Sequence, residues 1–201
     1  MSDYSVIADV GKTLTKLLWD NMKTDPQIRP AILTSEDDIS LSSPEDIAAG
    51  NNKKLSFFLY QVAENPHLRN NKMQVTDPVK LKHVPLTLDL FYLVTPNTDD
   101  SSKDHTLLGK VMQIFYDNAI VKGSILQGSL EGTTEELRVV QYSLPFDELI
   151  RLWQSFSERS FKLSVSYQVT PIRIDSTREV EAKRVIEMET SHYQSLVKSA
   201  K

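Results

Sequence analysis

The chain has 201 residues, of which 40% are hydrophobic and 25% are charged, a composition typical of a soluble globular protein. The net charge of −4 provides no overall positive field for nucleic acid, and the lack of cysteine excludes disulfides and cysteine-ligated zinc. The start of the chain is polar and acidic, unlike a signal peptide, and no apolar run approaches the ~20 residues of a membrane helix. We therefore expect a protein that is made in the cytoplasm.

The first part of the chain predicts a long helix over residues 5–22, where apolar residues recur every three or four positions. The short segment 29–33 is a candidate strand. A brief helix is expected after Ser43, because this capping serine precedes Pro44 at the first helical position and two acidic residues.

Residues 55–62 are nearly all apolar or aromatic, which predicts a strand that is buried on both faces and central to the sheet. Pro66 lacks an N–H group and pushes Asn65 out of the helical region, so the strand ends there. The segment 65–83 is predicted to be a long loop, and such loops are often functional. It is polar and basic, as expected of a solvated loop or of a docking surface for an acidic protein. The side chains concerned are His67, Arg69, Asn70, Lys72, Lys80, Lys82 and His83.

The second half of the chain alternates between strand and helix patterns. Three glycines, at positions 123, 128 and 132, predict a flexible crossing between a helix and a strand. Strands are predicted over residues 85–96, 137–144 and 161–170, and helices over residues 103–120 and 145–156.

The strand over residues 161–170 alternates strictly between apolar and polar residues, which predicts one buried face and one wet face. The wet face carries Lys162 and Gln168 and is a candidate surface for a partner. Beyond residue 175 the chain becomes charged and loses periodicity, so we expect an arm there, with Arg178 and Arg184 as candidate contacts. Such an arm could add a strand to the sheet edge of a neighbour.

These patterns predict a single α/β (α+β) domain over residues 1–175, followed by a charged C-terminal arm over residues 176–201. Its core would be a mixed β-sheet of about four to six strands, flanked by three main helices. The order of the strands cannot be deduced from the pattern.

No motif predicts a catalytic, cofactor-binding or metal-ligating residue. The Gly-Lys-Thr run at 11–13 resembles the end of a phosphate-binding loop, but position 6, where that loop needs its first glycine, is valine. The glycines at 123 and 128 are followed by serine where that loop has lysine. The four histidines have no partner at metal-ligand spacing.

Asp89 interrupts an apolar strand, which predicts either a buried pair or a position at an interface. We favour a structural or interface pair, for which an arginine or lysine is a candidate partner. The alternative is a catalytic carboxylate with a raised pKa, for which His105 is the candidate partner.

Ordered blocks along most of the chain, from about residue 5 to 176, resemble one family. It is the tail-terminator (cap) protein family of extracellular contractile injection systems, which are phage-tail-like particles such as antifeeding prophages and Photorhabdus virulence cassettes. The blocks are Ile7–Gly11, Ile39–Pro44, Leu55–Val62, Glu64–Asn70, Pro85–Pro96, His105, Leu107–Gln113, Asp117-Asn118, Trp153, Phe161–Tyr167 and Ile174–Ser176.

The resemblance implies a hexameric ring on the last layer of the inner tube, in contact with the last sheath layer. Such a ring would end polymerisation and fix the length of a particle that is released, membrane-anchored or cytoplasmic. It implies no catalysis, cofactor, nucleic acid, small-molecule substrate or membrane insertion. The alternatives are an assembly chaperone or adaptor for tube and sheath subunits, or a small hydrolase. The candidate interface residues are His67, Arg69, Asn70, Lys72, Lys80, Lys82, Asp89, Lys162, Gln168, Arg178 and Arg184.

Overall fold

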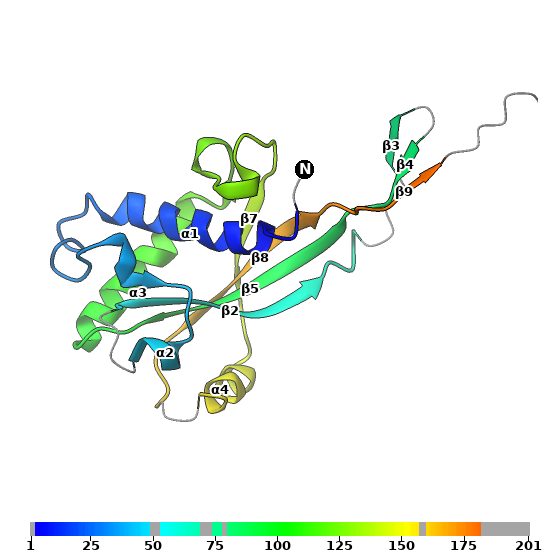
Figure 1. Ribbon diagram of the computed structural model, residues 1–201. Helices are drawn as coiled ribbons and strands as arrows, with labels where there is room; N and C mark the ends of the chain where they lie inside the picture. The colour runs from blue at the N-terminus through cyan, green and yellow to red at the C-terminus, as the bar shows by residue number, and fades with distance from the viewer. Residues whose placement is uncertain (1–2, 49–52, 69–73, 78–79, 157–159, 182–201) are drawn as a thin grey trace, which may run out of the picture.

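The computed structural model describes residues 3–48, 53–68, 74–77, 80–156 and 160–181 (Figure 1). Its centre is a six-stranded sheet in the order β1-β2-β5-β8-β7-β6. The first pair is parallel and all others are antiparallel, so the sheet is mixed. The predicted single α+β domain is therefore confirmed. The strands are β1 (Ile39–Ser40), β2 (Leu55–Glu64), β5 (Leu86–Pro96), β6 (Ile120–Val121), β7 (Leu137–Tyr142) and β8 (Val165–Ile174).

Helices cover the two faces of this sheet unequally (Figure 1). The long helices α1 (Val6–Met22) and α3 (Ser101–Asp117) pack on one face, and α4 (Phe146–Gln154) packs on the other. The five-residue helix α2 (Pro44–Ala48) lies near the start of β2. The three predicted main helices are confirmed, as is the brief one.

The main core lies between the sheet and the pair α1 and α3. Phe57 of β2 stacks on Tyr92 of β5 at 4.4 Å between ring centroids, and Phe115 of α3 meets Phe57 at 5.9 Å. On the opposite face, Leu93 packs against Trp153 and its neighbours in a smaller cluster. Alternation along β5 thus supplies both cores, as its apolar sequence predicts.

The prediction that residues 55–62 form a central strand, buried on both faces, is wrong. β5 lies nearer the centre, and β1 pairs only with Leu55 and Ser56 of β2. The first residues of β2 are buried, but Gln61, Val62 and Glu64 are exposed. The reason is that burial of an apolar strand depends on its neighbours, and β2 stands next to the edge.

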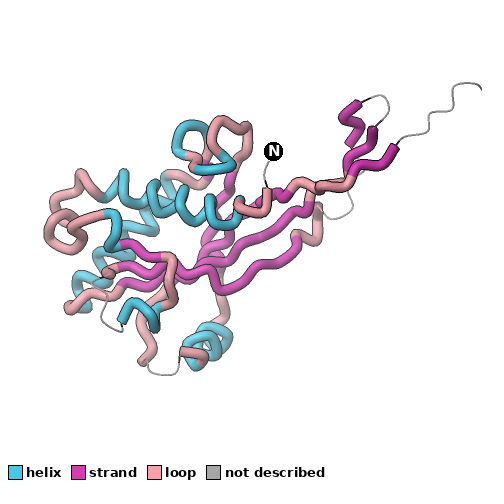
Figure 2. Tube along the Cα trace, viewed as in Figure 1, coloured by secondary structure: helices cyan, strands magenta, loops and turns pink. Residues whose placement is uncertain are grey.

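One loop prediction and one strand prediction also fail. The segment 65–83 contains β3 (Gln74–Asp77) and β4 (Lys80–Lys82), which pair with β9 (Glu179–Glu181) in a separate three-stranded sheet. Residues 29–33, predicted as a strand, form turns instead. Figure 2 shows the small sheet projecting away from the body, at the end of the continuous path from β8 to β9.

The strand predicted over 161–170 begins only at Val165 and continues to Ile174. It lies inside the sheet, between β5 and β7, so its polar face is partly covered. Ser166 is buried and its Oγ lies 2.9 Å from the Tyr60 hydroxyl, while Phe161 and Leu163 are 42% and 50% exposed. The expected division into a buried apolar face and a wet polar face is therefore only partly correct.

The predicted flexible glycine crossing is in fact docked on α1. Two 3-10 turns, η2 (Gly123–Ile125) and η3 (Gly128–Leu130), pack against the helix, and η3 meets it at Asp9. The Asp9 carboxylate accepts hydrogen bonds from the Ser129 backbone N–H at 2.9 Å and the Ser5 hydroxyl at 3.0 Å. Asp9 is only 4% exposed, and these bonds, led by that of the Ser129 amide, lower its pKa to about 2.

This low pKa predicts how stability depends on pH. Because the folded pKa lies below the ordinary 3.8, the Asp9 contribution is complete above pH 3.8 and disappears as the pH falls toward 2. Asp9→Asn should lower the free energy of unfolding by about 2 kcal/mol near pH 6, and the difference from wild type should shrink toward pH 2.5. Urea unfolding at several pH values measures this difference. Lys12→Ala removes only a mostly exposed partner of Asp9 and should change little.

Candidate functional site

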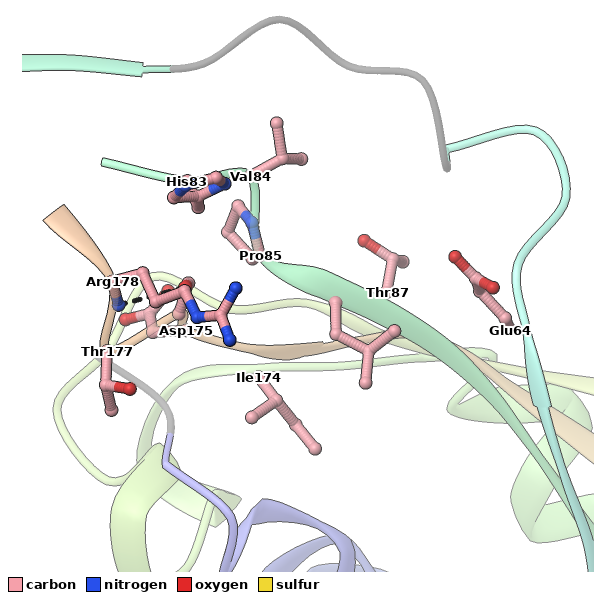
Figure 3. Close-up of a pocket in the computed structure, with 11 residues that line it drawn as sticks. Glu64, His83, Val84, Pro85, Thr87, Ile174, Asp175, Thr177 and Arg178 are labelled. Atoms are coloured by element: carbon pink, nitrogen blue, oxygen red, sulfur yellow. Dashed lines mark hydrogen bonds between the residues drawn. The ribbon is translucent and has the colours of Figure 1, made fainter. Parts of the chain in front are cut away.

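The end of the main sheet that faces the small sheet forms an open cavity of about 500 Å³. The end of β2, the start of β5 and the end of β8 bring Glu64, Thr87 and Ile174 to its wall. Figure 3 shows Arg178 extending into this space between Pro85 and Ile174. The cavity therefore combines apolar residues such as Pro85 and Ile174 with charged ones, among them Glu64, Asp175 and the exposed Arg178.

The cavity lies at the neck where the body narrows into the small sheet (Figure 1). At the neck the His83 N–H donates to the Arg178 carbonyl at 3.4 Å, which joins the segment that follows β4 to the segment that precedes β9. In the small sheet, Lys80 stands opposite Glu181, and Lys82 stands opposite Glu179. The register thus places an acidic residue across from each of these lysines in the backbone ladder.

The predicted interface residues fall into groups. His67, in the turn after β2, is exposed, as is Arg178 at the neck. Lys162 lies at the other end of the sheet, where its Nζ is 3.0 Å from Asn97 Oδ1 and 3.7 Å from the Asp104 carboxylate. Gln168 is in the middle of β8 and half-buried. Arg69, Asn70, Lys72 and Arg184 lie outside the described residues.

Asp89 is buried, but the cationic partner predicted for it is wrong. Its Oδ1 accepts hydrogen bonds from Asn65 Nδ2 at 2.9 Å and from the Thr170 hydroxyl. Asn65 Oδ1 in turn accepts the backbone N–H groups of His67 at 3.0 Å and Leu68 at 3.1 Å. Two neutral donors satisfy the carboxylate, and the same asparagine shapes the turn that carries His67.

Asn65→Ala should lower the free energy of unfolding by about 1–3 kcal/mol, because it removes a partner of the buried Asp89 carboxylate and the acceptor for the turn. Thermal unfolding measures this change. Asn21→Ala is a matched control, since the Asn21 side chain bonds only to the Leu17 carbonyl within α1. An effect no larger than that of the control would contradict this account of Asn65.

The geometry separates the two residues of the hydrolase alternative. Asp89 is near the start of β5, whereas His105 lines a different cavity beside Pro96, at the end of that strand. Seven residues of strand span about 23 Å, so the two side chains cannot act on one substrate atom. Within the described ranges, no group of three or more histidine, aspartate or glutamate side chains could hold a metal.

The sequence did not reveal an aromatic surface on the sheet face that carries α4. Phe91 lies 6.3 Å from Tyr60 and 5.0 Å from Tyr142 between ring centroids. Val140, in the same strand as Tyr142, is 52% exposed. The sequence feature that could have revealed this surface is the pair Val140 and Tyr142, which occupy outward-facing positions of β7 where polar residues are usual.

A family model described as the Pvc16 N-terminal domain matches residues 9–188. The chain belongs to this family. The relationship predicted from the sequence blocks is thus confirmed, and the matched region includes the body, the neck and the small sheet. No curated protein matches the chain.

Two solved structures resemble this Pvc16 N-terminal domain fold. One is the PVC sheath/tube terminator of an extracellular contractile injection system in the extended state, with a TM-score of 0.64 and 19% identity. The match covers 99% of this chain and 67% of that one. The other is the tube-terminating cap of the anti-feeding prophage, with a TM-score of 0.58 and 18% identity over 92% of this chain and 61% of that one. At these identities the likeness establishes the fold.

The helices of the described segments include none that is long and apolar enough to span a membrane.

Proposed function

We propose that the chain is a structural cap of a contractile injection system. It forms a hexameric ring on the end of the inner tube and sheath, stops the addition of further subunits and so fixes the particle length. Membership of the Pvc16 N-terminal domain family over residues 9–188 carries this proposal. The shared fold with a sheath/tube terminator and a tube-terminating cap supports it.

The role is structural and involves no reaction. Its partners are other copies of the chain, the tube protein and the sheath protein. In this proposal the domain over residues 1–175 forms the ring, and the arm over residues 176–201 contacts a neighbouring subunit. The chain is made in the cytoplasm and then becomes part of the particle.

The neck and the projection are the proposed contact with tube or sheath. Arg178 and His67 are exposed there, and Asp89 supports the surface from below, since it is 6% exposed and bonded to Asn65. A projecting element held by two segments can reach a second protein while the body stays packed in a ring.

Deletion of the chain from cells that assemble the particle tests the proposal. We expect tails of uncontrolled length or with unstable ends by electron microscopy, and normal lengths when the wild-type chain is restored. Wild-type tails without the chain would refute it. Mass spectrometry of intact particles separates a cap, which remains in them, from an assembly chaperone or adaptor, which does not.

Charge reversal at the neck tests the proposed contact. Arg178→Glu should reduce the fraction of capped particles while leaving the thermal unfolding temperature nearly unchanged, because the side chain is exposed. Arg151→Glu is the matched control, since Arg151 is an exposed arginine on α4. Equal loss of capping in both variants would show that the neck is not the contact.

A further inference from the structure

The main sheet has two open edges. At one, β1 pairs only with Leu55 and Ser56, so residues 57–63 of β2 have no outer strand among the described residues. At the other, β6 pairs with Leu137 and Arg138, and the Ala119 carbonyl accepts a hydrogen bond from the Val139 N–H. Beyond that point, residues 140–142 of β7 have no outer strand within the described ranges. Open edges of this kind present backbone groups to any strand that fits.

Neither edge carries the side chains that usually discourage pairing. Residues 57–63 and 139–142 contain no charged residue and no proline. Val62 is 45% exposed and Val140 is 52% exposed. A bulge between Leu59 and Gln61 interrupts the ladder with β5, so regular outer pairing is expected on either side of it.

The directions of the strands decide how two copies can join. β2 is antiparallel to β5, β5 to β8, and β8 to β7, so β2 and β7 run in opposite directions. A second copy placed edge to edge in the same orientation therefore brings its β7 alongside β2 as an antiparallel strand. This contact joins two different surfaces, so it repeats from copy to copy and closes into a ring when the rotation allows.

The side chains at the two edges also match. Gln61 is paired with Phe91, Phe91 with Gln168, and Gln168 with Val140, so Gln61 and Val140 lie on the same face of the sheet. That face carries the aromatic surface of Tyr60, Phe91 and Tyr142. Joining the edges would bring Val140 and Tyr142 of one copy beside Tyr60 of the next and remove them from water.

We propose that the β2 edge of one copy pairs antiparallel with the β7 edge of the next, so that the sheets of neighbouring subunits become continuous. The closure of this contact into a ring rests on the proposed cap function. The pairing itself rests on the two edges.

The lack of native cysteine allows a direct test by disulfide cross-linking. Particles are assembled with a Gln61→Cys, Val140→Cys double variant and oxidised. We expect a ladder of linked chains on a non-reducing gel, because opposed positions of adjacent strands lie close enough for a disulfide. Ala63→Cys replaces Gln61→Cys in a second set, since it lies two positions along on the same face and accommodates a different register.

Single variants identify the geometry. A mixture of Gln61→Cys chains with Val140→Cys chains should link one to the other, whereas a link between two Gln61→Cys chains would overturn the proposal in favour of a symmetric dimer. A pair of Gln61→Cys and Tyr116→Cys is the control, since Tyr116 is 86% exposed on α3 and should give no ladder. Adding Tyr142→Lys to the Gln61→Cys, Val140→Cys variant should reduce the yield of the ladder about tenfold, and adding Leu163→Lys, at another exposed apolar residue, should not.

Failure of the pairing and failure of the cap function give different results. If the chain is found in particles but no ladder forms with either cysteine set, the edge pairing is wrong and the cap function stands. If the chain is absent from particles, the cap function is wrong. The mixture of single variants is then oxidised as concentrated purified protein, where a 61–140 link supports the edge pairing and its absence overturns it.

Discussion

Phe57→Ala is expected to lower the free energy of unfolding by about 3–5 kcal/mol. The Phe57 ring is fully buried, stacks on Tyr92 and meets Phe115, so it connects β2, β5 and α3. Its removal leaves a cavity among three rigid elements that cannot collapse easily. Urea unfolding followed by circular dichroism measures the change.

Phe146→Ala is the matched control for this prediction. Phe146 is 69% exposed on α4 and has an edge contact with Phe161 at 6.0 Å. The same change of side chain should cost less than about 1 kcal/mol there. Similar losses in the two variants would mean that the core is not organised around Phe57.

Gly128→Ala should destabilise the protein by about 2–5 kcal/mol. Gly128 has a φ of +62°, and a Cβ at this position would lie 2.3 Å from Asp9 Cγ. The substitution combines the strain of a left-handed backbone with a clash against a buried carboxylate, which then loses its bond to Ser129. The thermal unfolding temperature should fall accordingly.

Gly132→Ala separates these two causes. Gly132 also has a positive φ, of +71°, but a Cβ there would meet nothing within 4 Å. We expect it to cost only the backbone term of about 1 kcal/mol. In addition, Asp9→Ala combined with Gly128→Ala should destabilise the protein by less than the sum of the two single changes. Each single change already disrupts the same contact between Asp9 and η3. Equal effects of the two glycine variants would argue against the docking of η3 on α1.

Local patterns were sufficient to predict α1, α3 and β5. The apolar stripe of α1 and the alternation along β5 each carry their own signal of burial. The prediction for β2 failed because an apolar sequence does not show whether a strand has neighbours on both sides. Along most of its length, β2 pairs with β5 alone among the described residues. Strand order depends on pairings between distant parts of the chain, such as Leu55 with Pro96 in β2 and β5.

The small sheet and the docked turns could not be predicted for the same reason. β4 and β9 are short, polar strands from distant segments, such as those that pair Lys80 with Glu181. Strands this short contain no alternation of apolar and polar residues long enough to predict them. The bond from Ser129 to Asp9 joins residues that are 120 positions apart. Within the candidate site, the basic composition of residues 65–83 drew attention to a segment that leads to the neck, and its role as a contact stays a prediction, whereas the partners of Asp89 required coordinates.

The three-stranded sheet also affects how shortened versions of the chain should be designed. A truncation after Asp175 would remove β9 and leave β3 and β4 as a two-stranded hairpin, which is at best marginally stable in water. Such a truncation would thus disturb the 74–82 segment as well as the arm. Swapping the residues at Lys82 and Glu179, which are register partners in β4 and β9, keeps both segments and one residue of each charge at the two positions. Charge-swapped full-length chains are therefore a cleaner way than deletion to assign a role to the arm.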